Sequence, residues 1–117
     1  MKIRIKGNAV RFRLTRSEVE GISKESPIVE TVDFGVNILS YTVKVTEKDL
    51  FEISYANNEI TLEFPLCYLK EWQTTDKVGY QSASGSVSIL IEKDFTCLDN
   101  VVEDQSDNYP NPLLTKS

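Results

Sequence analysis

The basic residues of this 117-residue chain gather at its beginning, where they could bind an anion. The first 16 residues contain six bases and no acid. These bases are Lys2, Arg4, Lys6, Arg11, Arg13 and Arg16. The net charge of −5 therefore combines a local +6 with −11 for the other residues, which hold seven bases and 18 acids. One basic segment on an acidic chain favours a local anion site over general binding to nucleic acid.

The spacing of these bases predicts that four of them share one face of a β-hairpin. Residues 2–6 and 9–14 alternate apolar with polar residues, and Gly7-Asn8 between them suits a two-residue type II′ turn. This turn sets Arg4 opposite Arg11 and Lys2 opposite Arg13. Like charges in direct cross-strand contact are unfavourable by roughly a few tenths of a kcal/mol per pair. We therefore expect a negative partner for this hairpin.

Two partners would satisfy the hairpin, and the sequence leaves both open. In the first interpretation a phosphate or carboxylate ligand binds there. The ligand-binding residues would be Lys2, Arg4, Arg11 and Arg13. In the second, Glu52 and Glu63 of a later hairpin neutralise the charge within the chain. The second is the simpler interpretation, because surface charges usually need no ligand.

An acidic segment near the end of the chain is the second group of residues that could do chemistry. Its carboxylates are Asp99, Glu103, Asp104 and Asp107. They do not match the spacing of an EF-hand loop, so we expect at most weak binding of Mg²⁺ or Ca²⁺. A solvated tail over residues 95–117, or a tail that docks on the basic hairpin, fits the same residues.

The absence of histidine limits the chemistry available to the chain. It removes histidine-based triads and every zinc site that needs an imidazole. Cys67 and Cys97 lie far apart and are typical of reduced thiols in a cytoplasmic protein. No motif predicts a cofactor, a metal centre or catalytic residues. We therefore expect a binding protein rather than an enzyme.

No segment of the sequence resembles a membrane span or a secretory signal. The longest apolar runs fall far short of the roughly 20 residues that a spanning helix needs. The opening residues alternate charge with isoleucine, unlike the continuous apolar segment of a signal peptide. We expect a cytoplasmic protein without a membrane partner, and the oligomeric state does not follow from the sequence.

The sequence repeats its own pattern at an offset of fifty residues. This offset aligns Ile3 with Ile53 and Phe12 with Leu62, and it places Gly7-Asn8 on Asn57-Asn58. A match at one fixed period indicates a duplicated structural unit. We expect one domain over residues 1–117, with repeats at 2–45 and 51–92.

Each repeat is predicted to follow the order ββαββ. Thr15 and Glu18 fit a capping box at the start of the first helix, and Pro65 suits the first turn of the second. Alternating strands predict sheets with one buried face. The predicted fold is therefore α+β: two tandem repeats with pseudo-twofold symmetry, two short helices, and a mainly antiparallel eight-stranded sheet or barrel.

Three stretches together resemble a small, uncharacterised bacterial protein family without assigned function. They are residues 2–20, 70–81 and 90–112, which begin KIRIK, KEWQT and LIEKD. The resemblance covers nearly the whole chain and implies a single cytoplasmic domain. It brings no functional residue.

The strand order is more distantly similar to two known folds, each of which implies a function. CYTH-type triphosphatases have a duplicated eight-stranded barrel, which implies a metal-dependent hydrolase of a phosphorylated compound. In that case Arg4, Arg11 and Arg13 would bind phosphate and the tail carboxylates would bind metal. The family's Glu-x-Glu-x-Lys motif is absent, since residues 2–6 read Lys-Ile-Arg-Ile-Lys.

The second fold is that of AbrB and MazE-type domains, which dimerise by exchanging hairpins of a ββαββ unit. Residues 6–20 are similar to their Gly-Asn turn, strand and helix. This similarity implies a DNA-binding or antitoxin module made of two fused units. Only one of the two copies is basic, which does not favour nucleic acid as the partner.

Overall fold

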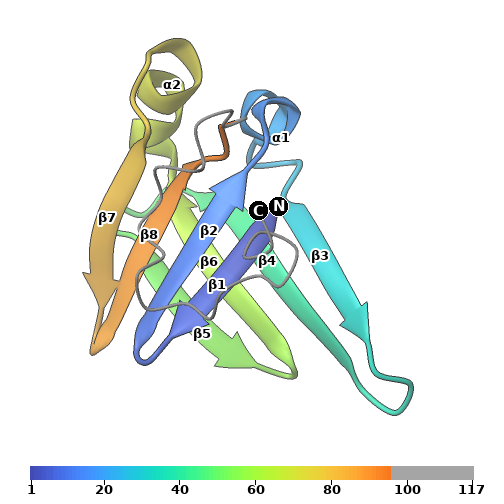
Figure 1. Ribbon diagram of the computed structural model, residues 1–117. Coiled ribbons are helices and arrows are strands. Elements are labelled where there is room, and N and C mark those ends of the chain that lie inside the picture. The colour runs from blue at the N-terminus through green and yellow to red at the C-terminus, as the bar shows by residue number, and fades with distance from the viewer. Residues whose placement is uncertain (96–117) are drawn as a thin grey trace, which may run out of the picture.

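A computed structural model describes residues 1–95, which form eight strands and two short helices (Figure 1). The first five elements are β1 (Lys2–Lys6), β2 (Ala9–Leu14), α1 (Arg16–Gly21), β3 (Ile28–Asp33) and β4 (Ile38–Thr46). The next five are β5 (Glu52–Ala56), β6 (Glu59–Pro65), α2 (Leu66–Thr74), β7 (Gly79–Ser84) and β8 (Val87–Lys93). The fold is thus α+β and consists mostly of strands, as the sequence predicts.

The eight strands form two four-stranded sheets, not the single eight-stranded sheet or barrel that we expected. The strand orders are β1-β2-β8-β7 and β3-β4-β6-β5, and neither sheet closes. In both sheets the two central strands run parallel, β2 with β8 and β4 with β6, and the outer pairs are antiparallel. Each sheet therefore joins a hairpin from the first half of the chain to one from the second.

Aromatic side chains link the two sheets near the helices. The ring centroids of Phe51, which directly precedes β5, and Tyr80 of β7 lie 5.6 Å apart. Phe64 of β6 packs edge-on against both rings. The edge strands β5 and β7 therefore contact each other through side chains, without the hydrogen-bonded pairing that would join the two sheets.

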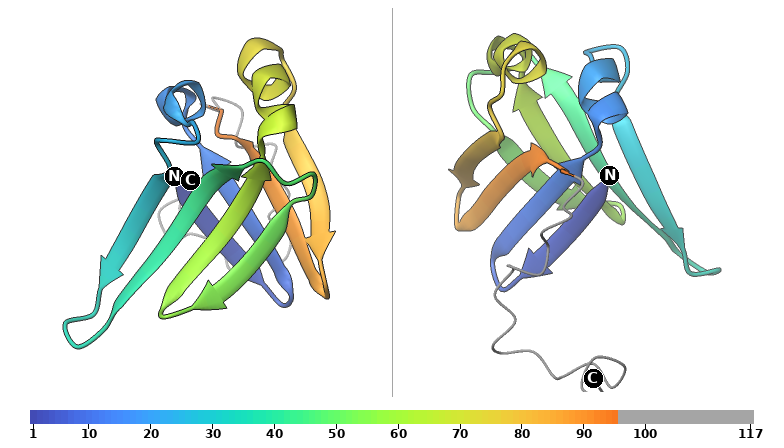
Figure 2. Two further views of the ribbon diagram at one scale, coloured as in Figure 1. Left: turned by 180° about the vertical axis from the view of Figure 1, so that it is seen from behind. Right: turned by 45° about the horizontal axis from the view of Figure 1, so that its top comes forward.

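The predicted hairpin turns are confirmed. Gly7 has φ +55°, and Asn57 and Asn58 have φ +53° and +61°, the positive values that tight two-residue turns require. The register places Lys2 opposite Arg13 and Arg4 opposite Arg11, as predicted. All four hairpin turns lie at one end of the molecule, and both helices lie at the other (Figures 1 and 2).

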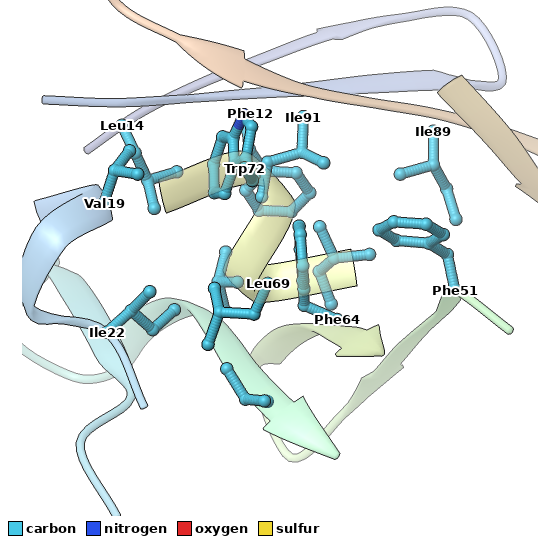
Figure 3. Packing of buried hydrophobic residues seen from close by; sticks show 13 residues of the cluster. Phe12, Leu14, Val19, Ile22, Phe51, Phe64, Leu69, Trp72, Ile89 and Ile91 are labelled. Atoms are coloured by element: carbon cyan, nitrogen blue, oxygen red, sulfur yellow. The ribbon is translucent and has the colours of Figure 1, made fainter. Parts of the chain in front are cut away.

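The core lies between the sheets at the helical end (Figure 3). Phe12, Phe64 and Trp72 are fully buried there, and the Trp72 indole donates a 3.1 Å hydrogen bond to the Val78 carbonyl. At the rim, the Tyr80 hydroxyl donates a 2.6 Å hydrogen bond to Glu71. Burial and, after it, this bond raise the pKa of Tyr80 above its usual range. Through Trp72, helix α2 therefore packs in the same core as residues of both sheets.

The predicted capping box at the start of α1 is present. The Thr15 hydroxyl accepts from the Glu18 backbone at 3.3 Å, and the Glu18 carboxylate accepts from the Thr15 backbone at 2.8 Å. Glu18 also accepts a 2.7 Å hydrogen bond from the Met1 ammonium. The two capping bonds satisfy amides that a helix of six residues would otherwise leave open.

We expect Thr15→Ala to lower the free energy of unfolding by about 1 kcal/mol, because the capping hydrogen bond is lost. Urea denaturation measures the change. Ser17→Ala is the matched control, since Ser17 lies in the same turn and makes only a 3.4 Å contact with the Thr15 hydroxyl. Equal losses in the two variants would show that the cap contributes nothing.

Candidate anion-binding surface

Five bases lie on the outer face of the sheet β1-β2-β8-β7, here named the basic face. They are Lys2, Arg4 and Lys6 of β1 with Arg11 and Arg13 of β2. Alternation along the strands puts them there, because Phe12 and Leu14 point into the core and are fully buried. The structure thus brings together all four residues proposed from the sequence and adds Lys6.

The end of β8 supplies the carboxylates that partly neutralise the basic face. The Glu92 Oε1 atom lies 2.9 Å from Arg13 Nε and 3.8 Å from Arg11 Nε. The Asp94 carboxylate lies 3.0 Å from the Lys2 ammonium. Glu92 is the direct neighbour of Arg13 in the parallel pairing of β2 with β8. Sequence alone did not indicate this pairing, although it did show two carboxylates at the end of the last strand.

Glu52 and Glu63 do not neutralise the basic face, so this interpretation was wrong. They are opposite each other on β5 and β6, in the other sheet. Both bind the Lys48 ammonium, at 3.1 Å and 2.9 Å. The reason is that the hairpin β1-β2 pairs with β8, whereas the hairpin β5-β6 pairs with β4.

Arg4 and Lys6 form no ion pair with any residue in 1–95. Both side chains are exposed, and with Arg11 they line a shallow groove of about 380 Å³. Gln81 and Ser88 border the same groove and can donate further hydrogen bonds. The groove therefore offers three cationic groups and two neutral donors, a set suited to the oxygens of a phosphate or a carboxylate.

The outer face of the other sheet carries the opposite charge. Its acidic residues are Asp33, Glu52, Glu59 and Glu63, and the bases beside them are Lys44 and the Lys48 that binds Glu52 and Glu63. Glu59 accepts a 2.6 Å hydrogen bond from the Thr42 hydroxyl. The two outer faces thus differ in sign, which concentrates positive potential on one side of the molecule.

The remaining candidates from the sequence lie mostly beyond the part of the chain that the structure describes. Asp99, Glu103, Asp104 and Asp107 all fall outside residues 1–95, and so does Cys97. Within those 95 residues, no group of three or more histidine, cysteine, aspartate or glutamate side chains is placed to bind a metal. No helix in this part has both the length and the hydropathy to cross a membrane. Cys67 is a free, exposed thiol.

A family model matches residues 1–113, over all of the elements described above. The chain belongs to this family of unknown function, DUF7009. Membership confirms the resemblance to a family without assigned function. Neither a curated protein nor a solved structure matches the chain. For this DUF7009 chain, the function therefore has to be inferred from its own residues.

We expect Glu92→Gln to lower the free energy of unfolding by about 1 kcal/mol, because Arg11 and Arg13 lose their shared carboxylate. The loss should shrink in high salt, which screens the repulsion among the bases. Urea denaturation at low and high NaCl measures both effects. Glu52→Gln is the control, since that carboxylate binds only the exposed Lys48. An equal loss for the two variants at every salt concentration would contradict the proposed role of Glu92.

Proposed function

We propose that this protein binds a polyvalent anion on its basic face, without a catalytic step. One observation carries the proposal. Arg4 and Arg11 are directly opposite each other on neighbouring strands, and Arg4 and Lys6 have no carboxylate partner among residues 1–95. Like charges held this close destabilise the folded state unless a negative group joins them. A bound anion supplies that group.

The spacing of the bases favours a ligand with more than one charged group. Arg4 and Lys6 are alternate residues of β1, so their Cα atoms are about 6.7 Å apart. Arg11 approaches from β2 on the side of the groove that holds Ser88. Several cationic groups along this row attract a ligand with several negative charges more strongly than a singly charged one. A diphosphate, a triphosphate or a dicarboxylate carries such charges.

We also propose that the two halves of the chain are duplicated units that exchange hairpins. The element order ββαββ occurs twice, and each sheet combines the first hairpin of one half with the second hairpin of the other. The parallel pairing of β2 with β8 has its counterpart in that of β6 with β4. In the second unit, Ser54 and Thr61 take the places of Arg4 and Arg11. The two arginines of the anion site therefore have no counterparts in the second unit, which contributes only the neutral side chains of the groove.

Hairpin exchange supports a second candidate, a DNA-binding or antitoxin module similar to AbrB and MazE-type domains. Such a module usually offers its partner two equivalent basic surfaces, one from each unit. Here one outer face is basic and the other acidic, which supports a small anion over duplex DNA. A hydrolase similar to CYTH-type enzymes receives less support, because its barrel requires a closed sheet and neither sheet closes.

We expect tripolyphosphate to stabilise the protein, because a ligand that binds only the folded state raises its stability. At about ten times its dissociation constant, the ligand should raise the melting temperature by roughly 5 °C. Thermal denaturation at increasing tripolyphosphate measures the effect. Arg4→Ala should remove most of it, and added NaCl should weaken it.

Lys44→Ala is the matched control, because Lys44 is an exposed strand residue on the acidic outer face. Its melting temperature should rise with tripolyphosphate as that of the wild type does. Identical flat curves for the wild type and Arg4→Ala would rule out the anion site. Tight binding of a short duplex, measured by fluorescence anisotropy, with no response to tripolyphosphate would favour the DNA-binding candidate instead.

A further inference from the structure

The inner faces of the two sheets leave an apolar cleft at the end that carries the hairpin turns. The cleft has a volume of about 350 Å³, and Val10, Leu39, Ile53, Tyr55 and Ile60 are among its lining residues. The core closes the space between the sheets near the helices, but no such packing closes it here: Ile5 is 57% exposed and Tyr55 is 66% exposed. Exposed apolar surface of this kind marks an interaction site.

A second apolar feature projects from the same end of the molecule. The hairpin β3-β4 is longer than its neighbour, because its pairing continues to Asp33 and Ile38, whereas β6 pairs with β4 only from Ser40 onward. Residues 34–37 form the projecting turn, named here the hairpin tip (Figure 2). Phe34 is 68% exposed and Val36 is 95% exposed. A single chain thus presents both an apolar protrusion and an apolar cleft.

The charges around the two features are complementary. Residues 31–39, which include the hairpin tip, contain one acid, Asp33, and no base. The hairpin β1-β2 forms one side of the cleft through Val10, and its Lys6 is exposed and makes no ion pair with residues 1–95. Asp33 directly precedes the tip, and Lys6 directly precedes the turn at the cleft's mouth. A tip that enters the cleft of another copy would bring opposite charges together.

We propose that two copies of this protein associate end to end, with the hairpin tip of each copy in the apolar cleft of the other. Because tip and cleft lie at the same end, a twofold axis through that end satisfies both contacts at once, as a closed symmetric dimer requires. Phe34 and Val36 become buried against the cleft residues of the partner copy. This contact shares Lys6 with the anion site proposed above but does not use Arg4 or Arg11, which lie on an outer face.

Analytical ultracentrifugation of the full chain over a range of concentrations tests the proposal. The wild type should sediment as a dimer that dissociates on dilution. Val36→Asp at the tip and Tyr55→Glu in the cleft should each shift the protein to monomer, by at least tenfold in dissociation constant. Both positions are exposed, so both variants should keep the wild-type circular dichroism spectrum. Leu50→Asp is the matched control, because Leu50 is 68% exposed in the loop between β4 and β5 at the helical end.

Mixing the two variants makes the test specific to this geometry. A mixed dimer retains one intact contact, between the tip of the Tyr55→Glu copy and the cleft of the Val36→Asp copy. The mixture should therefore contain dimer at concentrations where each variant alone is monomeric. A wild type that stays monomeric at the highest concentration would overturn the proposal. Dimers that persist in both variants would overturn it as well.

Discussion

The parallel contact between the central strands of each sheet is the constraint on which the rest of the molecule depends. β2 pairs with β8 and β4 pairs with β6, so each sheet needs one hairpin from each half of the chain. This pairing brings Glu92 beside Arg13, and it places Ser88 next to Ala9 at the groove. It also separates the basic hairpin β1-β2 from the acidic hairpin β5-β6. Without it, the two hairpins could neutralise each other and leave no charged face.

Local features could be predicted from the sequence because they depend on a few neighbouring residues. Gly7 with Asn8, and Asn57 with Asn58, favour tight turns through their tolerance of positive φ. Once a turn is placed, alternation determines the register and puts Arg4 opposite Arg11. Thr15 and Glu18 form the cap of α1 by contacts within four residues. Each of these predictions follows from the geometry of one hairpin or one helical turn.

The arrangement of the hairpins could not be predicted, because it depends on contacts between distant residues. Alternating strands show which face is buried but not which hairpin lies alongside. The fifty-residue offset suggested that the basic hairpin β1-β2 lies beside the acidic hairpin β5-β6. In the structure, β1-β2 pairs with β8 and β5-β6 pairs with β4. Closure of the sheet depends on contacts of the same kind. Phe51, Phe64 and Tyr80 belong to different elements, and only the structure shows that their rings pack against one another across the two sheets.

The parallel pairing of β2 with β8 also governs the order in which the chain can fold. Arg13 and Glu92 meet across 79 residues of sequence, so the first sheet cannot be completed until the last strand has been synthesised. During translation the edge of β2 stays unpaired until β8 is synthesised, and the edge of β4 stays unpaired until β6 is synthesised. Chains dominated by such distant pairings fold slowly and expose strand edges while they do so. The bases of β1 and β2 then have a second effect. Because they carry like charges, they oppose the pairing of this unpaired strand edge with the same edge of another chain.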